Sequence, residues 1–311
     1  MKGQLLQLLR SANEIVSGEA LSAELGVSRV SVWKHIRKLR EYGYPIRSSP
    51  KGYRLCSDPD VLYPWEFPQR ESKIHYFPEV SSTMDIAREK ARSGCSDFTV
   101  VIAGRQNRGR GRLDRTWHSV EGGLYLTIVL RPLILPVLSA RIGFAASLTL
   151  CQTLRSLYGI EAVVKWPNDI LVAERKVSGM LAEMEAETDR IRYINIGLGI
   201  NVNNDPTPVE PHAASLREIL GRPVSRKNLL AEFLDAFEKR IGRNDLETVL
   251  HEWKHYTSTI GRVVKIVTHT EESEGNAVDV DENGALILEL SDGSFKKIIY
   301  GDCFHRSGRI L

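Results

Sequence analysis

Gly26 most restricts how the start of this chain can fold, because it separates two short segments with helical periodicity. The first covers residues 20–25, and Ser28 is suited to cap the second, which runs to Tyr44. Glycine readily adopts the left-handed backbone that a tight turn between helices requires. Leucines within residues 5–9 predict a further amphipathic helix, so we expect a compact head of three helices.

The helix predicted after Ser28 has one apolar side and one basic side. Val32, Ile36 and Leu39 share one side at the helical angle and should be buried. The other side resembles a recognition helix that enters the DNA major groove. The predicted DNA-binding residues are Ser28, Arg29, Val30, Ser31, Lys34, Arg37 and Lys38. Residues 44–55 predict a basic hairpin, so residues 1–58 read as a winged helix-turn-helix domain.

Charge is distributed unevenly along the chain. The 311 residues include 42 Lys and Arg against 39 Asp and Glu, a net charge of +3. Residues 1–54 hold ten of the basic and four of the acidic residues, which puts the head at +6 and the rest at −3. A basic head favours a polyanionic partner such as operator DNA, although a solvated basic face on a small helical domain would show the same charge.

The region after the head has few signs of regular structure or of metal binding. Residues 59–73 lose periodicity and gain prolines, which predicts a linker. The four cysteines are scattered without a Cys-x-x-Cys pair, so we expect no metal at a fixed protein site. The N-terminus turns polar too early for a signal peptide, and the apolar runs are too short to span a bilayer. A cytoplasmic protein without a membrane partner is expected.

The central region mixes strand and helix patterns and predicts an α+β or α/β body with a substantial sheet. Residues 141–158 and 229–241 show helical spacing. The expected strands are residues 98–103, 123–130, 162–166 and 191–200.

A loop rich in arginine and glycine, residues 104–117, lies between two of these strands. Arginine donors suit phosphate and carboxylate oxygens, and glycine lets backbone N–H groups approach an anion. A solvated basic loop or an RNA-binding tract would have a similar composition, but Trp117 at its end can stack on a nucleobase. No Gly-x-x-x-x-Gly-Lys-Ser/Thr motif occurs in the chain, so a P-loop nucleotidase is excluded.

Two further motifs are less specific when each is taken alone. Residues 164–171 contain a Pro-Asn-Asp run that a simple turn would explain, followed by Lys176 and Gly179. Residues 197–201, Gly-Leu-Gly-Ile-Asn, form only a weak dinucleotide fingerprint, because a third glycine and a following helix are missing.

Taken together, these motifs resemble the biotin–protein ligase family in order and spacing over the whole chain. The winged head resembles its bifunctional type, ligase and biotin operon repressor in one chain (the BirA-like family). The matching elements are Ser81–Asp85, Gln106, Gly109–Arg112 with Arg115 and Trp117, Lys165–Asp169, Arg175, Lys176, Gly179 and Gly199–Asn201. The family usually has glycine where this chain has Asp114, which bears on how the loop closes and holds a polyanion.

The resemblance implies a class II synthetase-like ligase domain over residues 74–257. Its reaction joins biotin and ATP, with Mg²⁺, into biotinyl-5′-AMP and then moves biotin to a lysine of a biotin carboxyl carrier protein domain. The implied catalytic residues are Lys176, Arg110, Arg112 and Arg115. The implied biotin-binding residues are Ser82, Thr83, Met84, Gln106, Arg110, Gly111, Arg112, Lys176 and Gly179. The implied ATP- and adenylate-binding residues are Arg112, Arg115, Trp117, Asn168, Lys176 and Asn201.

The tail, residues 258–311, predicts short strands joined by Asn-Gly and Asp-Gly turns. The resemblance implies an SH3-like β-barrel there. It also implies that bound biotinyl-5′-AMP favours a homodimer, the form in which a helix-turn-helix usually reads a two-fold operator. Two alternatives stay open: a lipoate–protein ligase of the same fold, and a transcription factor whose ligase body only senses biotin.

Overall fold

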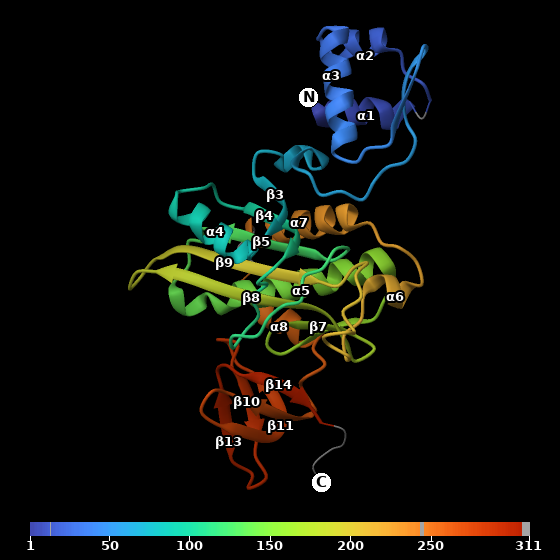
Figure 1. Ribbon diagram of the computed structural model, residues 1–311. Coiled ribbons are helices and arrows are strands. Elements are labelled where there is room, and N and C mark those ends of the chain that lie inside the picture. The colour runs from blue at the N-terminus through green and yellow to red at the C-terminus, as the bar shows by residue number, and fades with distance from the viewer. Residues whose placement is uncertain (13, 243–245, 307–311) are drawn as a thin grey trace. The chain divides into compact units, whose positions relative to one another are not determined.

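The computed structural model describes residues 1–12, 14–242 and 246–306 of the chain (Figure 1). It divides into two compact units, Met1–Ser72 and Lys73–Leu311. The predicted boundaries after residues 58, 73 and 257 are a finer division and stay a prediction.

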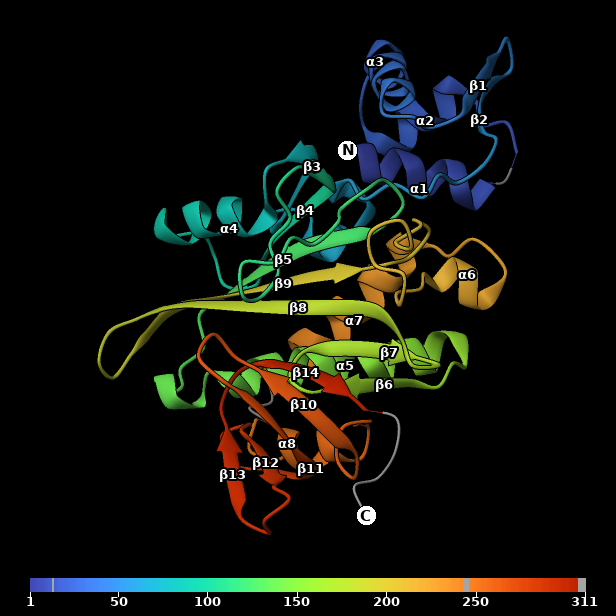
Figure 2. The same ribbon diagram turned by 60° about the horizontal axis from the view of Figure 1, so that its bottom comes forward.

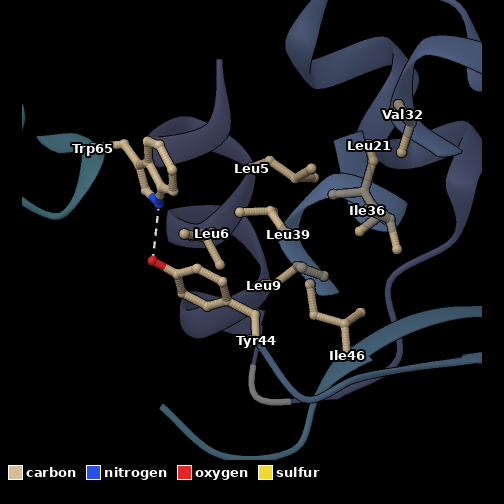
Figure 3. Packing of buried hydrophobic residues seen from close by; sticks show 10 residues of the cluster. All are labelled: Leu5, Leu6, Leu9, Leu21, Val32, Ile36, Leu39, Tyr44, Ile46 and Trp65. Atoms are coloured by element: carbon tan, nitrogen blue, oxygen red, sulfur yellow. Dashed lines mark hydrogen bonds between the residues drawn. The ribbon is translucent and has the colours of Figure 1, made fainter. Parts of the chain in front are cut away.

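The N-terminal unit is a three-helix head with a hairpin. Its core joins all three helices to the hairpin through Leu5, Leu21, Ile36 and Ile46, as Figure 3 shows. Gly26 ends the second helix with a left-handed φ of 63°, as the turn requires. The elements are α1 (Lys2–Ala12), α2 (Gly18–Leu25), α3 (Arg29–Glu41), β1 (Ile46–Ser49) and β2 (Gly52–Leu55), with antiparallel pairing of the two strands.

The segment predicted to be a linker is part of this unit. Trp65 lies in the short helical turn η1 (Pro64–Glu66) and belongs to the core of the head, and its indole donates a 2.8 Å hydrogen bond to the hydroxyl of Tyr44 (Figure 3). Arg10 lies 2.8 Å from a carboxylate oxygen of Glu66. Pro64 and Pro68, two of the prolines that suggested a linker, begin the short helical turns η1 and η2 (Pro68–Arg70), and the linker over residues 59–73 stays a prediction.

A seven-stranded mixed sheet forms the centre of the second unit. The strand order is β3-β4-β5-β9-β8-β7-β6, with β3 and β4 parallel and the other neighbours antiparallel. The strands are β3 (Ile74–Val80), β4 (Thr99–Gln106), β5 (Leu124–Leu130), β6 (Ala162–Lys165), β7 (Asp169–Val172), β8 (Arg175–Ala186) and β9 (Ile191–Ile200). The mixed sheet of the predicted fold is confirmed, and β3, β7 and β8 are strands that the sequence pattern did not indicate.

Helices cover this sheet on both faces (Figures 1 and 2). One face packs against α4 (Thr83–Arg92), whose Ala87 and Ala91 contact Val101 of β4 and Tyr193 of β9. The other face carries the long helix α5 (Ala140–Tyr158), with α7 (Arg226–Gly242) and α8 (Val249–Lys254) packed on it. A fifth helix, α6 (Leu216–Leu220), and a turn η3 (Pro136–Leu138) are the other helical elements among the described residues of this unit.

One stretch of the described residues, Pro136–Tyr158, has the length and apolar composition of a membrane span. Within its most apolar window, 61% is buried inside the fold, as expected for a core helix.

The C-terminal residues form a separate five-stranded sheet in the order β13-β12-β11-β10-β14. Its strands are β10 (Val263–Val267), β11 (Glu272–Val280), β12 (Leu286–Glu289), β13 (Phe295–Ile298) and β14 (Asp302–His305). Neighbouring strands pair antiparallel, which confirms a β-rich C-terminal part. Closure into an SH3-like barrel stays a prediction.

Candidate functional site

A cavity of about 920 Å³ opens on the sheet face that also carries α4. Gly197 and Gly199 line it, and they lie on the same face of β9 as Tyr193, which packs under that helix, because residues an even number of positions apart share a face of a strand. Further lining comes from the start of α4, the arginine–glycine loop, β7, β8, β14 and residues 206–213. All the residues predicted for biotin, adenylate and catalysis line this one cavity.

At one end of the cavity, hydroxyl and amide groups form a closed set of hydrogen bonds. Ser82 is fully buried and caps α4, accepting from the backbone N–H of Met84 at 3.3 Å. The side-chain oxygen of Gln106 accepts from the N–H of Thr83 at 2.7 Å and from its hydroxyl at 3.0 Å. The hydroxyl of Thr127 donates to that of Thr83 at 2.8 Å. These groups can exchange partners with a small polar ring that carries both donors and acceptors.

The middle of the cavity is a slot made by glycines on adjacent strands. A Cβ atom on Gly179 would lie 2.8 Å from the indole of Trp117, and one on Gly199 would overlap the same indole. A Cβ on Gly197 would lie 2.6 Å from the sulfur of Met84. The strands therefore need glycine at these positions to hold Trp117 and Met84 against the sheet.

Lys176 is the cation at the centre of the slot. Its Nζ lies 2.8 Å from Oδ1 of Asp169 and 5.4 Å from the centroid of the Trp117 ring. A register shift between β7 and β8 falls beside Leu171, the residue that pairs with Lys176. The site thus holds a positive charge between an acid and an aromatic face.

The three predicted arginines take different positions. Arg112 is largely buried, and its guanidinium donates to the side-chain oxygen of Asn168 at 3.3 Å and to the carbonyl of Gly301 at 3.2 Å. Burial is the main cause that lowers the pKa of Arg112 from its usual value. Arg115 pairs with Asp302 at 2.5 Å. These contacts bring the C-terminal sheet to the arginine–glycine loop.

Arg110 faces a different acidic pair. It lies 2.5 Å from Glu183 of β8 and 3.3 Å from Asp85 of α4. It lines the cavity but points along its edge toward these acids, so in this structure its charge is already neutralised. Gly111, next to it, donates its N–H to the carbonyl of Arg115 at 2.7 Å and closes the tip of the loop.

The two asparagines predicted for nucleotide binding are held by the scaffold. Asn168 donates its amide to the carbonyl of Met180, and its peptide follows a cis Trp166–Pro167 bond. Asn201 is 2% exposed and accepts from the amide of Asn204 at 3.0 Å. Both line the cavity, and both also hold the turns on which they sit.

The sequence analysis missed the contribution of the C-terminal sheet. Asp302 and His305 of β14 line the cavity, as does Arg262 just before β10. Arg262 makes two 2.8 Å hydrogen bonds to Glu174 at the β7–β8 turn, and His305 lies 3.9 Å from the same carboxylate. Short β-strands give no sequence signal for contacts between residues 88 or more positions apart.

The head carries the predicted nucleic-acid interface on α3. The Ser28 hydroxyl accepts from the N–H of Ser31 at 3.2 Å and caps the helix as predicted. Ser31 is half-buried beside the cap. The other predicted residues, Ser28, Arg29, Val30, Lys34, Arg37 and Lys38, are exposed. Trp33 is also exposed, and the sequence analysis did not single it out.

No set of three or more His, Cys, Asp or Glu residues able to hold a metal ion occurs in the described part of the chain. The expectation that Mg²⁺ enters only with ATP stays a prediction.

Comparison with known proteins assigns a family model to each part of the chain. Residues 76–201 match the biotin/lipoate A/B protein ligase family, residues 2–54 an HTH domain, and residues 259–306 the biotin protein ligase C-terminal domain. The bifunctional ligase/repressor BirA of Bacillus subtilis is 34% identical, covering 97% of this chain and 98% of that protein. The protein of the same name from Escherichia coli is 30% identical, covering 98% and 97% respectively.

Solved structures show the same similarity. The biotin protein ligase from Aquifex aeolicus, in complex with biotin and ATP, superposes with a TM-score of 0.64 at 28% identity. The match covers 76% of this chain and 99% of that one.

Proposed function

The chain belongs to the biotin/lipoate A/B protein ligase family, in its bifunctional ligase/repressor group, and we propose that it ligates biotin to a carrier protein and represses transcription. The observation that carries the ligase activity is the convergence of Lys176, Arg112 and Trp117 with the Thr83–Gln106 hydroxyl and amide set in one cavity.

Biotin can lie along the cavity with its ureido group at the end that carries the hydroxyl groups and its carboxylate toward the cations. Its ureido group carries donors and acceptors that match Ser82, Thr83 and Gln106, and its apolar rings match the glycine slot beside Met84. The valerate carboxylate then reaches toward Lys176. Because Lys176 is a compact point charge, it can contact that carboxylate and the α-phosphate of ATP together.

In the first step, a biotin carboxylate oxygen bonds to the α-phosphorus of ATP and the bond to the β-phosphate oxygen breaks. Pyrophosphate leaves with Mg²⁺, and biotinyl-5′-AMP remains. Lys176, Arg112 and Arg115 stabilise the negative charge that develops, and Trp117 offers a face for adenine. Asn168 and Asn201 lie where they can contact the nucleotide, and Gly111 and Gly179 let backbone approach it.

In the second step, the amine of a carrier lysine attacks the acyl carbon, loses a proton and releases AMP. We propose a biotin carboxyl carrier protein domain as the acceptor. The loop from Arg110 to Arg115 covers the adenylate and limits its hydrolysis before the carrier arrives.

The proposed repressor function places α3 in the major groove of operator DNA, with Lys34, Arg37 and Lys38 near phosphates. Bound biotinyl-5′-AMP acts as corepressor by favouring a homodimer, in a cytoplasmic protein that binds no membrane. Ordering the arginine–glycine loop around the ligand lowers the entropy cost of packing a second subunit beside it.

Mass spectrometry of a carrier domain incubated with the full chain, biotin and MgATP tests the ligase function. A mass increase corresponding to one biotin is expected, and lipoate in place of biotin should give none. Transfer of lipoate but not of biotin would show that the chain is a lipoate–protein ligase. Pyrophosphate release separates a ligase from a biotin sensor, which would release none.

A further inference from the structure

A tryptophan lies on the solvent side of the recognition helix α3. Within the N-terminal unit, Trp33 is 48% exposed and Val30 is 62% exposed, whereas Val32 and Ile36 on the other side of the helix are at most 1% exposed. The helix is capped and its core side is filled, so this exposure follows from helical phase and not from loose packing. A large apolar side chain displayed beside charges on a helix indicates a contact surface.

Trp33 and its neighbours form a strip along the helix. Val30 precedes Trp33 by three residues and Arg37 follows it by four, so the three side chains are adjacent on one face. The guanidinium of Arg37 lies 5.2 Å from the centroid of the Trp33 ring. This stacking holds an apolar surface and a cation side by side.

The surroundings of the strip fit a nucleic acid. Lys34 and Lys38 are exposed next to it, and residues 1–54 carry a net charge of +6. Cations suit the phosphates at the edges of a major groove, while the apolar group that a base pair presents at its floor is the 5-methyl group of thymine. Val30 and Trp33 lie in the first turns of α3, the part of a recognition helix that contacts base edges.

We propose that Trp33, together with Val30, reads thymine in the operator through its 5-methyl group, and that Trp33 also positions Arg37 for the DNA. This inference rests on the proposed repressor function, and it names one determinant of its sequence specificity. Arg37 is positioned because stacking on the indole restricts its rotamers.

The test starts from duplexes that the full chain selects from a random pool in the presence of biotin and MgATP. Each thymine of a selected duplex is then replaced singly by deoxyuridine, which removes only the methyl group. Affinities are measured for the wild type, Trp33→Ala and the matched control Lys34→Ala on the same helix.

For the wild type, we expect deoxyuridine at one or more thymines of each half-site to weaken binding by about fourfold, the value of one buried methyl group. Trp33→Ala should bind the unmodified duplex about tenfold more weakly and lose the response to deoxyuridine. Lys34→Ala should weaken binding to every duplex and keep that response, because it removes a phosphate contact.

Equal deoxyuridine responses in the wild type and Trp33→Ala would overturn the proposal, as would wild-type binding that no methyl deletion weakens. Unchanged DNA affinity in Trp33→Ala would instead assign the strip to another partner, such as a protein. Trp33→Gln, which keeps a long side chain, and the melting temperature and far-UV circular dichroism of the isolated variants report whether the fold of the head is intact. Failure to select any duplex would reject the repressor function itself, a result distinct from these.

Discussion

Nζ of Lys176 lies 2.8 Å from Oδ1 of Asp169, so the cation at the centre of the cavity already has a partner before any ligand enters. Asp169 begins β7 and Lys176 lies near the start of β8, and the hairpin between them fixes the pair. The carboxylate holds the amine in the slot without enclosing it, because about a third of the Lys176 side chain remains exposed. The adenylation step can therefore use this amine without a large rearrangement.

Lys176→Ala should lower the rate of pyrophosphate release with biotin and MgATP by about 10²-fold or more, because it removes a charge that stabilises the transition state. The melting temperature should stay near that of the wild type. Arg175→Ala is the matched control: its side chain pairs with Glu218 instead of lining the cavity, so pyrophosphate release should persist. Near-normal release from Lys176→Ala would rule out its proposed role.

Removal of the head should separate the two activities. Deletion of residues 1–72 should abolish operator binding and leave adenylate synthesis measurable, because the second unit has its own core. Deletion of residues 1–55 alone should give a less soluble protein, because it removes the core residues that cover Trp65 and leaves this side chain exposed to solvent. Operator affinity that survives either deletion would contradict the helix-turn-helix assignment.

Arg37→Ala should lower operator affinity and flatten its dependence on salt by about one counterion, as removal of a phosphate contact does. The measurement is a binding titration at several salt concentrations. An affinity loss with an unchanged salt slope would show that Arg37 contacts a base instead.

Asp114→Gly should slow the dissociation of biotinyl-5′-AMP. Leu113 and Asp114 both have left-handed backbone, with φ of 50° and 58°, which costs a non-glycine residue about 1 kcal/mol or more. The substitution also removes a negative charge near the phosphate. Asp114→Asn removes only the charge, and Leu113→Gly relaxes only the backbone. The rates at which biotinyl-5′-AMP dissociates from these two variants therefore separate the effect of charge from that of backbone strain. Faster dissociation from Asp114→Gly would contradict this view of the loop.

His305 should make the fold sensitive to mild acid. Burial, followed by the charges of Lys165 and Arg262, lowers the pKa of His305 to about 4 from 6.5. Between these values the unfolded chain binds a proton that the folded chain excludes, so the free energy of unfolding falls as the pH drops from about 6.5 to 4, by up to about 3 kcal/mol. Above about pH 7.5 both states leave His305 unprotonated, so the residue then contributes little pH dependence.

Urea unfolding of the wild type and His305→Gln at pH 7 and pH 5 measures this contribution. The variant should lose less stability between the two pH values than the wild type. Equal losses would assign the acid sensitivity to other groups.

Biotinyl-5′-AMP should promote homodimerisation, and only the dimer should bind the operator tightly. Sedimentation velocity with and without the ligand measures the change, and operator DNA must favour the dimer in return by linkage. An unchanged weight-average mass at saturating ligand would reject the dimer switch while leaving the ligase function in place.

Local patterns predicted the elements that depend on neighbours in sequence. The Ser28 cap, the Gly26 turn and the apolar face of α3 follow from caps and periodicity, and the structure confirms all three. Helix α4 has a similar signal, with Ser82 as its cap and Asp85 in the first turn, but the sequence analysis used those residues only as ligand contacts.

Contacts between distant segments could not be predicted in the same way. The pairing of Arg115 with Asp302 joins residues almost two hundred positions apart, and neither residue's local pattern indicates the other. The place of Trp65 in the core of the head is a similar case, because prolines around it have the composition of a linker.

The glycine slot also gives the enzyme an intrinsic optical reporter. Of the five tryptophans, Trp166 and Trp253 are at most 1% exposed, and Trp33 and Trp65 belong to the head. Trp117 is half-buried in the cavity wall, and its ring N–H is buried without a hydrogen-bond partner among the described residues. A nucleotide stacked on this indole should quench its emission, so a titration could follow adenylate formation in real time without a label.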